Sequence, residues 1–518
     1  MKRRSFLKNS SFLTLPMLLN GLPVSAVGKN MFFNSFAEDN DNVLVLIQLN
    51  GGNDGLNTII PMDKYNILGN VRSNILIPEN EVIKVTDEVG FNPAMTGLKN
   101  LYDNANLAVV QDAGYPNQNR SHFRSIDIWK TGSPAEEFWT TGWMGRYFDN
   151  RFPEFPEGYP NEENPHPFAI TLGNAVSETC QGTLSNFSLA LTDPFSLSPL
   201  SDTTAGALPD TPYGKELDFL RTAIAQSNAY SGVVSEAAEK GANASILYGE
   251  SSLEQQLKTI ALLIAGGLKT KVYVANIGGF DTHANQVVGG NTITGEHTEL
   301  LGSLSDAMNA FQDDLNKLGL NEKVITMTFS EFGRRIRSND SLGTDHGTAA
   351  PLLVSGSCIN PGFLGSTPDL PDDPSVGDGV AMQHDFRDIY GSILIDWFGV
   401  EETEVKSLLF EDFKHIAVIN SCDSGTTPTI DITLDDTEIY NYPNPCEEWT
   451  TIHFDSKGEH YRVSLFDGLG KEIQVISNQK IAPGPTKLKI ETRSLAPGNY
   501  FYRISSINGI RTKALVKV

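Results

Sequence analysis

The sequence contains few cysteines, and no two of them lie close together. The four are Cys180, Cys358, Cys422 and Cys446, and no C-x-x-C motif is present. Zinc sites built from thiolates need closely spaced cysteines, so a site of that kind is not expected. Disulfides form in proteins that leave the cytoplasm, but the spacing does not tell which of these cysteines pair.

Positive charge is also scarce. The chain has 39 Lys and Arg residues against 63 Asp and Glu, which gives a net charge of -24. A protein that binds nucleic acid needs a basic surface for the phosphates, so nucleic acid is not an expected partner. The acidity suits a soluble exported protein but identifies no partner. With 518 residues, of which 40% are hydrophobic and 20% charged, the composition is that of a globular protein of two or three domains.

The apolar run near the N-terminus is too short for a stable membrane span. It covers residues 11–24, is interrupted by Pro16, and falls short of the ~18 residues that a spanning helix needs. A basic segment precedes it and small residues follow, which predicts a signal peptide over 1–26 and a linker over 27–41. The pattern Arg-Arg-x-Phe-Leu-Lys resembles a twin-arginine export signal. A general secretory signal and an uncleaved anchor are the alternatives.

The next part of the chain, residues 42–420, alternates between predicted strands and helices. The strands read as continuous apolar runs, at 43–49, 107–110, 168–172, 271–277 and 324–329. Such runs are typical of strands covered on both faces, as in a parallel sheet. Ser251 and Glu254 have the spacing of a capping box at a helix start. We therefore expect an α/β domain with a mostly parallel sheet flanked by helices.

The composition changes near residue 421, and a small all-β domain is predicted after it. Residues 421–436 read as a linker, and 437–518 hold short strands of period two, as in a β-sandwich. Four motifs resemble the sorting domain (type A) of type IX secretion cargo: Tyr-Pro-Asn-Pro at 442–445, Leu-Phe-Asp at 465–467, Leu-Ala-Pro-Gly-Asn-Tyr at 495–500 and Lys-Ala-Leu-Val-Lys-Val at 513–518. The resemblance implies export through the periplasm to the cell surface or medium. A carbohydrate-binding or immunoglobulin-like module is the alternative, although the sequence reveals no exposed aromatic platform.

Acids and histidines follow the predicted strands. Asp281 and His283 come after one strand, Glu331 after the next, and Asp345 and His346 shortly before another apolar run. The carboxyl ends of parallel strands are where an open α/β sheet binds its ligand. Carboxylate with imidazole suits zinc, manganese or iron, whereas simple hydrogen-bonded pairs are the structural alternative.

Three further segments supply candidate residues. Asp54 follows the first strand in a glycine-rich turn, where it is a ligand for a hard metal such as calcium or a helix cap. Ser121 is a candidate nucleophile if a base or metal activates it, with His122 beside it, and a helix cap otherwise. Arg120 and Arg334 are candidates for holding an anionic substrate group.

Five motifs in order resemble the exported family catalogued as domain of unknown function 1501. They contain Asn50 to Asn57, Arg120 to Phe123, Gly279 to His283, Ser330 to Arg334 and Gly343 to Gly347. That family is similar to the alkaline phosphatase and sulfatase superfamily, whose members pair a two-metal site with a nucleophile. By this resemblance Asp54, Asp281, His283, Asp345 and His346 are metal ligands, Glu331 is a further ligand or base, and Ser121 is the nucleophile.

The chain also departs from that superfamily. Asn50 stands where an aspartate usually ends the first strand, and Asp281 and His283 are two residues apart rather than four. The leading hypothesis is an exported, metal-dependent hydrolase of phosphate or sulfate esters, acting on a small-molecule or glycan ester. The alternative is a non-catalytic cell-surface or glycan-binding protein that retains the scaffold. The sequence does not decide whether the chain is an enzyme.

Overall fold

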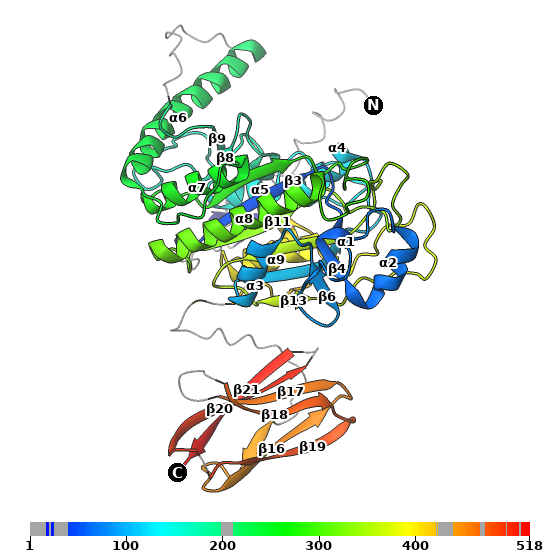
Figure 1. The fold of residues 1–518 in the computed structure, drawn as a ribbon. Helices are drawn as coiled ribbons and strands as arrows, with labels where there is room; N and C mark the ends of the chain where they lie inside the picture. The colour runs from blue at the N-terminus through cyan, green and yellow to red at the C-terminus, as the bar shows by residue number, and fades with distance from the viewer. Residues whose placement is uncertain are drawn as a thin grey trace. The chain divides into compact units, whose positions relative to one another are not determined.

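The computed structural model divides the chain into two compact units, Met1–Gly425 and Thr426–Val518 (Figure 1). The described residues are 17–19, 22–24, 40–197, 211–420, 422, 439–466, 472–493, 495–506 and 509–518. Within the predicted signal peptide only β1 (Met17–Leu19) and β2 (Leu22–Val24) are described, as an antiparallel pair. The rest of that peptide, the linker over 27–39 and nearly all of the linker over 421–436 lie outside the described residues. No helix among the described residues is long and apolar enough to cross a membrane.

The first unit is built on a nine-stranded sheet in the described part of the chain, ordered β13-β7-β12-β11-β3-β10-β8-β9, with β14 beside β7. Its strands are β3 (Val43–Asn50), β7 (Leu107–Gly114), β8 (Ala169–Leu172), β9 (Ser188–Leu191), β10 (Val272–Gly278), β11 (Val324–Phe329), β12 (Ala350–Ser355), β13 (Gly362–Leu364) and β14 (His384–Asp385). All five apolar runs predicted as strands lie in this sheet, and most neighbours are parallel. The predicted α/β class is confirmed.

One strand of this sheet runs the other way. β12 pairs antiparallel with both β11 and β7. The start of β12 therefore lies at the same edge as the carboxyl ends of β3, β10 and β11. This explains how Asp345 and His346, which precede β12, reach the same edge as residues that follow the parallel strands.

Helices cover both faces of the sheet. They are α1 (Gly55–Thr58), α2 (Tyr65–Val71), α3 (Thr96–Asp103), α4 (His122–Thr131), α5 (Trp143–Arg151), α6 (Pro212–Lys240), α7 (Ser252–Ala265), α8 (Glu296–Leu318), α9 (Phe386–Asp396) and α10 (Glu402–Leu408), with single 3-10 turns at Met62–Lys64 and Glu178–Cys180 (Figure 1). Along β3, Leu44 and Leu46 pack with α4, α5, α9 and α10, whereas Val45 and Ile47 pack with α3, α7 and α8. This two-sided burial is the reason why the strand sequences do not alternate.

The predicted capping box at the start of α7 is present. The Ser251 hydroxyl accepts a hydrogen bond from the Glu254 amide at 3.3 Å, and the Glu254 carboxylate accepts one from the Ser251 amide at 3.0 Å. Each side chain accepts a hydrogen bond from a backbone amide that has no partner within the helix. This pair of hydrogen bonds fixes where the helix begins.

The second unit is all-β, as predicted. One sheet joins β15 (Tyr440–Tyr442), β16 (Trp449–Ser456) and β19 (Gly484–Glu491), and the other joins β18 (Glu472–Lys480), β17 (His460–Phe466), β20 (Gly498–Ser506) and β21 (Gly509–Lys517). Ile452, Val463 and Tyr502 are among the residues of the shared core. Tyr440, Tyr442 and Trp449 are exposed aromatic side chains on the smaller sheet. The sequence did not reveal them, because the burial of an aromatic residue is not visible in a strand of unknown orientation.

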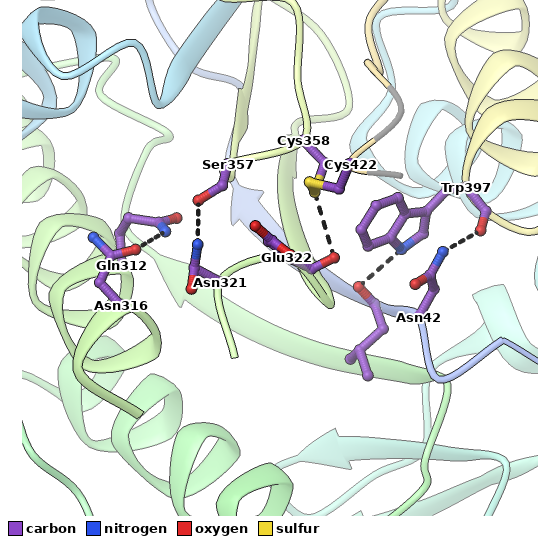
Figure 2. The surroundings of a disulfide bond; sticks show 10 residues. Asn42, Gln312, Asn316, Asn321, Glu322, Ser357, Cys358, Trp397 and Cys422 are labelled. Carbon is purple, nitrogen blue, oxygen red and sulfur yellow. Dashed lines mark hydrogen bonds between the residues drawn. A yellow bond between two sulfur atoms is a disulfide. The ribbon is translucent and has the colours of Figure 1, made fainter. Parts of the chain in front are cut away.

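A disulfide joins Cys358, in the loop after β12, to Cys422 near the end of the first unit (Figure 2). The Sγ atom of Cys358 lies 3.4 Å from the carbonyl oxygen of Glu322, just before β11. Cys180 and Cys446 are buried free thiols. The bridge closes a sequence separation of 64 residues, which restricts the unfolded chain.

Replacing both Cys358 and Cys422 with serine is expected to lower the free energy of unfolding of the first unit by about 2–4 kcal/mol, because the unfolded chain gains entropy. Denaturant titration measures the change, with reductant as the matched control. Reductant should shift the midpoint of the native protein and leave that of the double variant in place. A native midpoint that does not respond to reductant would contradict the expectation.

Asp112 is a buried acid in an unusual backbone conformation near the end of β7. It is 2% exposed, and its φ of 47° lies in the left-handed region. Burial raises the pKa of the Asp112 carboxyl to about 6, although a 2.6 Å hydrogen bond from Gln383 favours the ionised form. The folded state therefore holds a proton more strongly than the unfolded state, and stability falls as the pH rises from about 4 to about 6.

Asp112→Asn is expected to stabilise the protein at pH 8 by roughly 1–3 kcal/mol and to have little effect at pH 4.5. Asparagine tolerates the left-handed conformation and still accepts the bond from Gln383, but it carries no buried charge. Thermal unfolding of variant and native protein at both pH values tests this. An equal shift at both values would show that charge burial is not the cause.

Candidate metal centre

Five segments meet at the edge of the sheet where β3, β10 and β11 end. They are the turn after β3, the loops after β10 and β11, the segment before β12, and the segment leading into α4. Together they bring His122, Asp281, His283, Glu331, Arg334, Asp345 and His346 into one cluster. Most of the site residues predicted from the sequence are therefore neighbours.

The Oδ1 atom of Asp281 lies at the middle of this cluster. The Nε2 atoms of three histidines surround it, at 3.5 Å for His122, 3.2 Å for His283 and 3.3 Å for His346. Arg334 donates to the same oxygen at 2.7 Å. Burial raises the pKa of Asp281, but the hydrogen bond and charge of Arg334 outweigh it, so the pKa lies below its ordinary value. Asp281 is therefore a carboxylate at neutral pH.

The Nδ1 atoms of two of these rings have acceptors that fix their orientation. His122 Nδ1 lies 2.8 Å from Oε1 of Glu331, and His346 Nδ1 lies 2.8 Å from the carbonyl oxygen of Arg120. Both partners accept, so each Nδ1 carries a hydrogen and Nε2 is the ring atom left to bind a metal. The buried His122 Nε2 has no hydrogen-bond partner. Imidazoles held in this way are typical of metal ligands.

Arg334 is buried beneath the carboxylate. Its side chain is fully covered and donates to four carbonyl oxygens besides Asp281, those of Gly51, Gly52, Phe280 and Thr344. We predicted that Arg334 binds an anionic substrate group. The structure directs its donors to protein oxygens, so it holds the loops together.

Two glycines allow these segments to approach one another. Gly51 and Gly52 have φ values of 122° and 84°, which favour glycine. A Cβ atom on Gly51 would lie 2.2 Å from the Asp281 amide nitrogen, and one on Gly52 would lie 2.4 Å from the Phe332 ring. That ring packs under His122 and His346, with centroid distances of 4.9 and 4.6 Å.

Asp54, predicted as a metal ligand, is not in the cluster. Its carboxylate is buried and paired with Arg72 at 3.1 Å, and it also accepts a hydrogen bond from Gln286 at 2.6 Å. Gln286 in turn accepts from the hydroxyls of Thr282 and Thr344, which flank the cluster. Asp54 thus stabilises, from the protein interior, the loops that carry the cluster.

Asp345 and Glu331 both hold histidines in place. Asp345 faces His283 Nδ1 at 3.2 Å with one oxygen and Arg335 at 2.9 Å with the other. Glu331 is 4% exposed and also accepts from the Gly51 amide at 2.9 Å. Both were predicted to act at the metal or in catalysis; in the structure their carboxylates contact the rings.

Ser121 and Arg120 lie at the start of α4. Ser121 occupies the position just before the helix and is exposed, but its hydroxyl makes no capping hydrogen bond. Arg120 donates to the carbonyl oxygen of Gly377 at 2.7 Å. Burial, and then the nearby charge of Arg335, lower the pKa of Arg120.

The donor set fits a divalent transition metal. One atom each from His122, Asp281 and His346 lies within 4.8 Å of the others. Two imidazole nitrogens with one carboxylate oxygen suit zinc, iron or manganese better than calcium, which prefers oxygen alone. Sequence reasoning predicted His122 as a catalytic neighbour of Ser121 and did not anticipate its place in this donor set. The start of a helix carries no residue spacing that would have indicated it.

Two family models match the chain. A family model described as a protein of unknown function (DUF1501) matches residues 41–397, and one for a secretion system C-terminal sorting domain matches 440–518. No curated protein matches the chain.

Among solved structures, the chain is similar to an alkaline phosphatase superfamily protein from Vibrio parahaemolyticus (11% identity, 62% of each chain, TM-score 0.28). It is also similar to a phosphonate monoester hydrolase from Silicibacter pomeroyi (10% identity, 92% of this chain and 88% of that one, TM-score 0.30). A third is alkaline phosphatase from the Antarctic bacterium TAB5 (8% identity, 61% of this chain and 91% of that one, TM-score 0.23).

The sorting domain points to secretion or the cell surface. With the family model spanning most of its length, the chain belongs to the DUF1501 family of proteins of unknown function and ends in a secretion-system sorting domain.

Proposed function

We propose that the first unit is a metal-dependent hydrolase of phosphate or sulfate esters. The observation that carries this proposal is the convergence of imidazole Nε2 atoms on one carboxylate oxygen, with two of the rings oriented through Nδ1. His122, Asp281 and His346 hold the ion. A divalent ion bound there supplies Lewis-acid chemistry toward an ester oxygen.

The chain's own residues supply the remaining parts of the reaction. The Ser121 hydroxyl is exposed and makes no capping hydrogen bond, which leaves it able to attack the phosphorus or sulfur atom. As the new bond to the serine oxygen forms, the ester bond to the alcohol breaks and the alcohol leaves with the serine proton. Water then hydrolyses the serine ester and restores the hydroxyl. Ser121 also stands at the amino-terminal end of α4, where the helix dipole favours negative charge on its oxygen. Arg120 binds a charged oxygen of the ester, the role that the buried Arg334 does not take. Glu331 keeps the His122 ring in place.

The substrate is a small-molecule or glycan ester met outside the cytoplasm. We propose that residues 1–26 direct the folded protein into the periplasm by the twin-arginine route, and that the sorting domain then takes it across the outer membrane. The order of basic, apolar and small residues in 1–26 supports the first step. The family match over 440–518 supports the second.

Ser121→Ala and His346→Ala are each expected to lower turnover of aryl phosphates or sulfates by about a hundredfold or more. The first removes the nucleophile and the second removes a ligand. Hydrolysis is measured with zinc, manganese, iron and calcium in turn. His415→Ala is the control, since His415 pairs with Asp396 at 2.8 Å and belongs to no part of the centre. Normal turnover in both site variants would rule out this mechanism.

Glu331→Ala is expected to weaken metal binding by about 10–100-fold, because His122 loses the carboxylate that orients it. Glu331→Gln retains an acceptor for His122 Nδ1 and should be affected less. Competition of each variant against a chromogenic chelator measures the affinity. Equal affinities for the native protein and Glu331→Ala would show that Glu331 does not orient a ligand.

A further inference from the structure

The carboxylates at this edge of the sheet are nearly all engaged by protein partners. Asp54 pairs with Arg72 in the interior. Glu331 is buried against His122 and the Gly51 amide. Asp345 accepts from Arg335 and Asn339 and faces His283. Only Asp281 directs an oxygen to a point that several imidazole nitrogens share. The described residues therefore offer one set of acidic and imidazole donors, and no second set.

A cation already lies on the protein side of that carboxylate. The Arg334 guanidinium is surrounded by the carbonyl oxygens of Gly51, Gly52, Phe280 and Thr344 and by Asp281 Oδ1. Carbonyl and carboxylate oxygens are what a hard metal ion would require. Here a guanidinium, which does not lose its charge in proteins, occupies these surroundings.

We infer that this centre binds a single divalent ion through His122, Asp281 and His346, and that the guanidinium of Arg334 is the permanent second cation beside it. The inference deepens the proposed hydrolase and rests on the same site. The Oδ1 atom of Asp281 then binds the ion and also accepts the hydrogen bond from Arg334. The two-metal arrangement implied by the family resemblance is replaced by one ion and one fixed side-chain charge.

Two of the three separations between the donor atoms match a single tetrahedral ion, and the two histidine donors lie within 4.8 Å of each other. Bonds of 2.0–2.1 Å to a tetrahedral ion place its ligand atoms about 3.3 Å apart. The Asp281 Oδ1 atom lies 3.5 Å from His122 Nε2 and 3.3 Å from His346 Nε2. Three protein ligands leave one position of a tetrahedral ion for a substrate oxygen, as in catalytic zinc sites.

His283 is close, but the Nε2 atoms of His283 and His346 lie only 2.8 Å apart. Two ligand atoms of one tetrahedral ion lie about 3.3 Å apart, so these two nitrogens do not bind the same ion in these positions. His346 Nδ1 is directed at the Arg120 carbonyl oxygen, which leaves the Nε2 atom of His346 for the ion. Asp345 faces His283 Nδ1 and retains that ring at the rim.

The decisive measurement is the metal content of the full chain after equilibrium dialysis against excess Zn²⁺, with the visible spectrum of the Co²⁺ form as a second readout. We expect one ion per chain and the spectrum of a four-coordinate site. Two tightly held ions, or none, would overturn the inference. The count is independent of turnover. One ion without ester hydrolysis would defeat the proposed function alone, and two ions with hydrolysis would defeat the inference alone.

Two aspartates at the same rim form a matched pair of variants. Asp281 and Asp345 have side chains that are 48% and 36% exposed, and each pairs with an arginine. Asp281→Asn should weaken Zn²⁺ binding by more than about 100-fold, beyond the effect of a lost outer partner, whereas Asp345→Asn should stay within about 10-fold of the native protein. Equal losses in the two variants would contradict the assigned ligands. His122→Ala, which leaves the pair of Arg334 and Asp281 intact, should lose the ion with an unchanged circular dichroism spectrum.

Discussion

The ion pair between Arg334 and Asp281 is the interaction on which the arrangement of this centre depends. A guanidinium removed from water costs several kcal/mol unless oxygen atoms replace its hydration. In this fold those oxygens come from the turn after β3, the loop after β10 and the segment before β12. The donors of one side chain therefore position three loops at once. The same arrangement requires glycine at positions 51 and 52. Any side chain there would collide with the backbone or the ring that the guanidinium brings close.

Much of the fold was predictable because a strand that is buried on both faces has apolar residues at most of its positions. The runs at 43–49 and 324–329 are apolar at most positions, and both became central strands. The capping box at Ser251 was readable because all its parts lie within four residues. The reversed direction of β12 was not readable, since it depends on which neighbours the strand pairs with rather than on its own residues.

The candidate site was predictable in most of its members but not in their contacts. A position at the end of a strand can be recognised from the local sequence. On that basis Asp281, His283 and His346 were correctly predicted to lie together. Which residue pairs with a charged side chain depends on parts of the chain that are distant in sequence. The sequence predicts Asp54 as a ligand because it does not show that Arg72 turns back to it. It predicts Arg334 as a substrate-binding residue because nothing in the sequence shows that its side chain is fully covered.

The Cys358–Cys422 bridge lies at the place where the chain leaves the first unit. Cys422 lies at the start of the linker predicted over 421–436, which leads to the sorting domain. Tension applied through that linker reaches a covalent bond before it reaches α9 or α10. Those helices complete one face of the sheet. A cut in the linker likewise leaves Cys422 fastened to the loop after β12, so the first unit does not fray from that end.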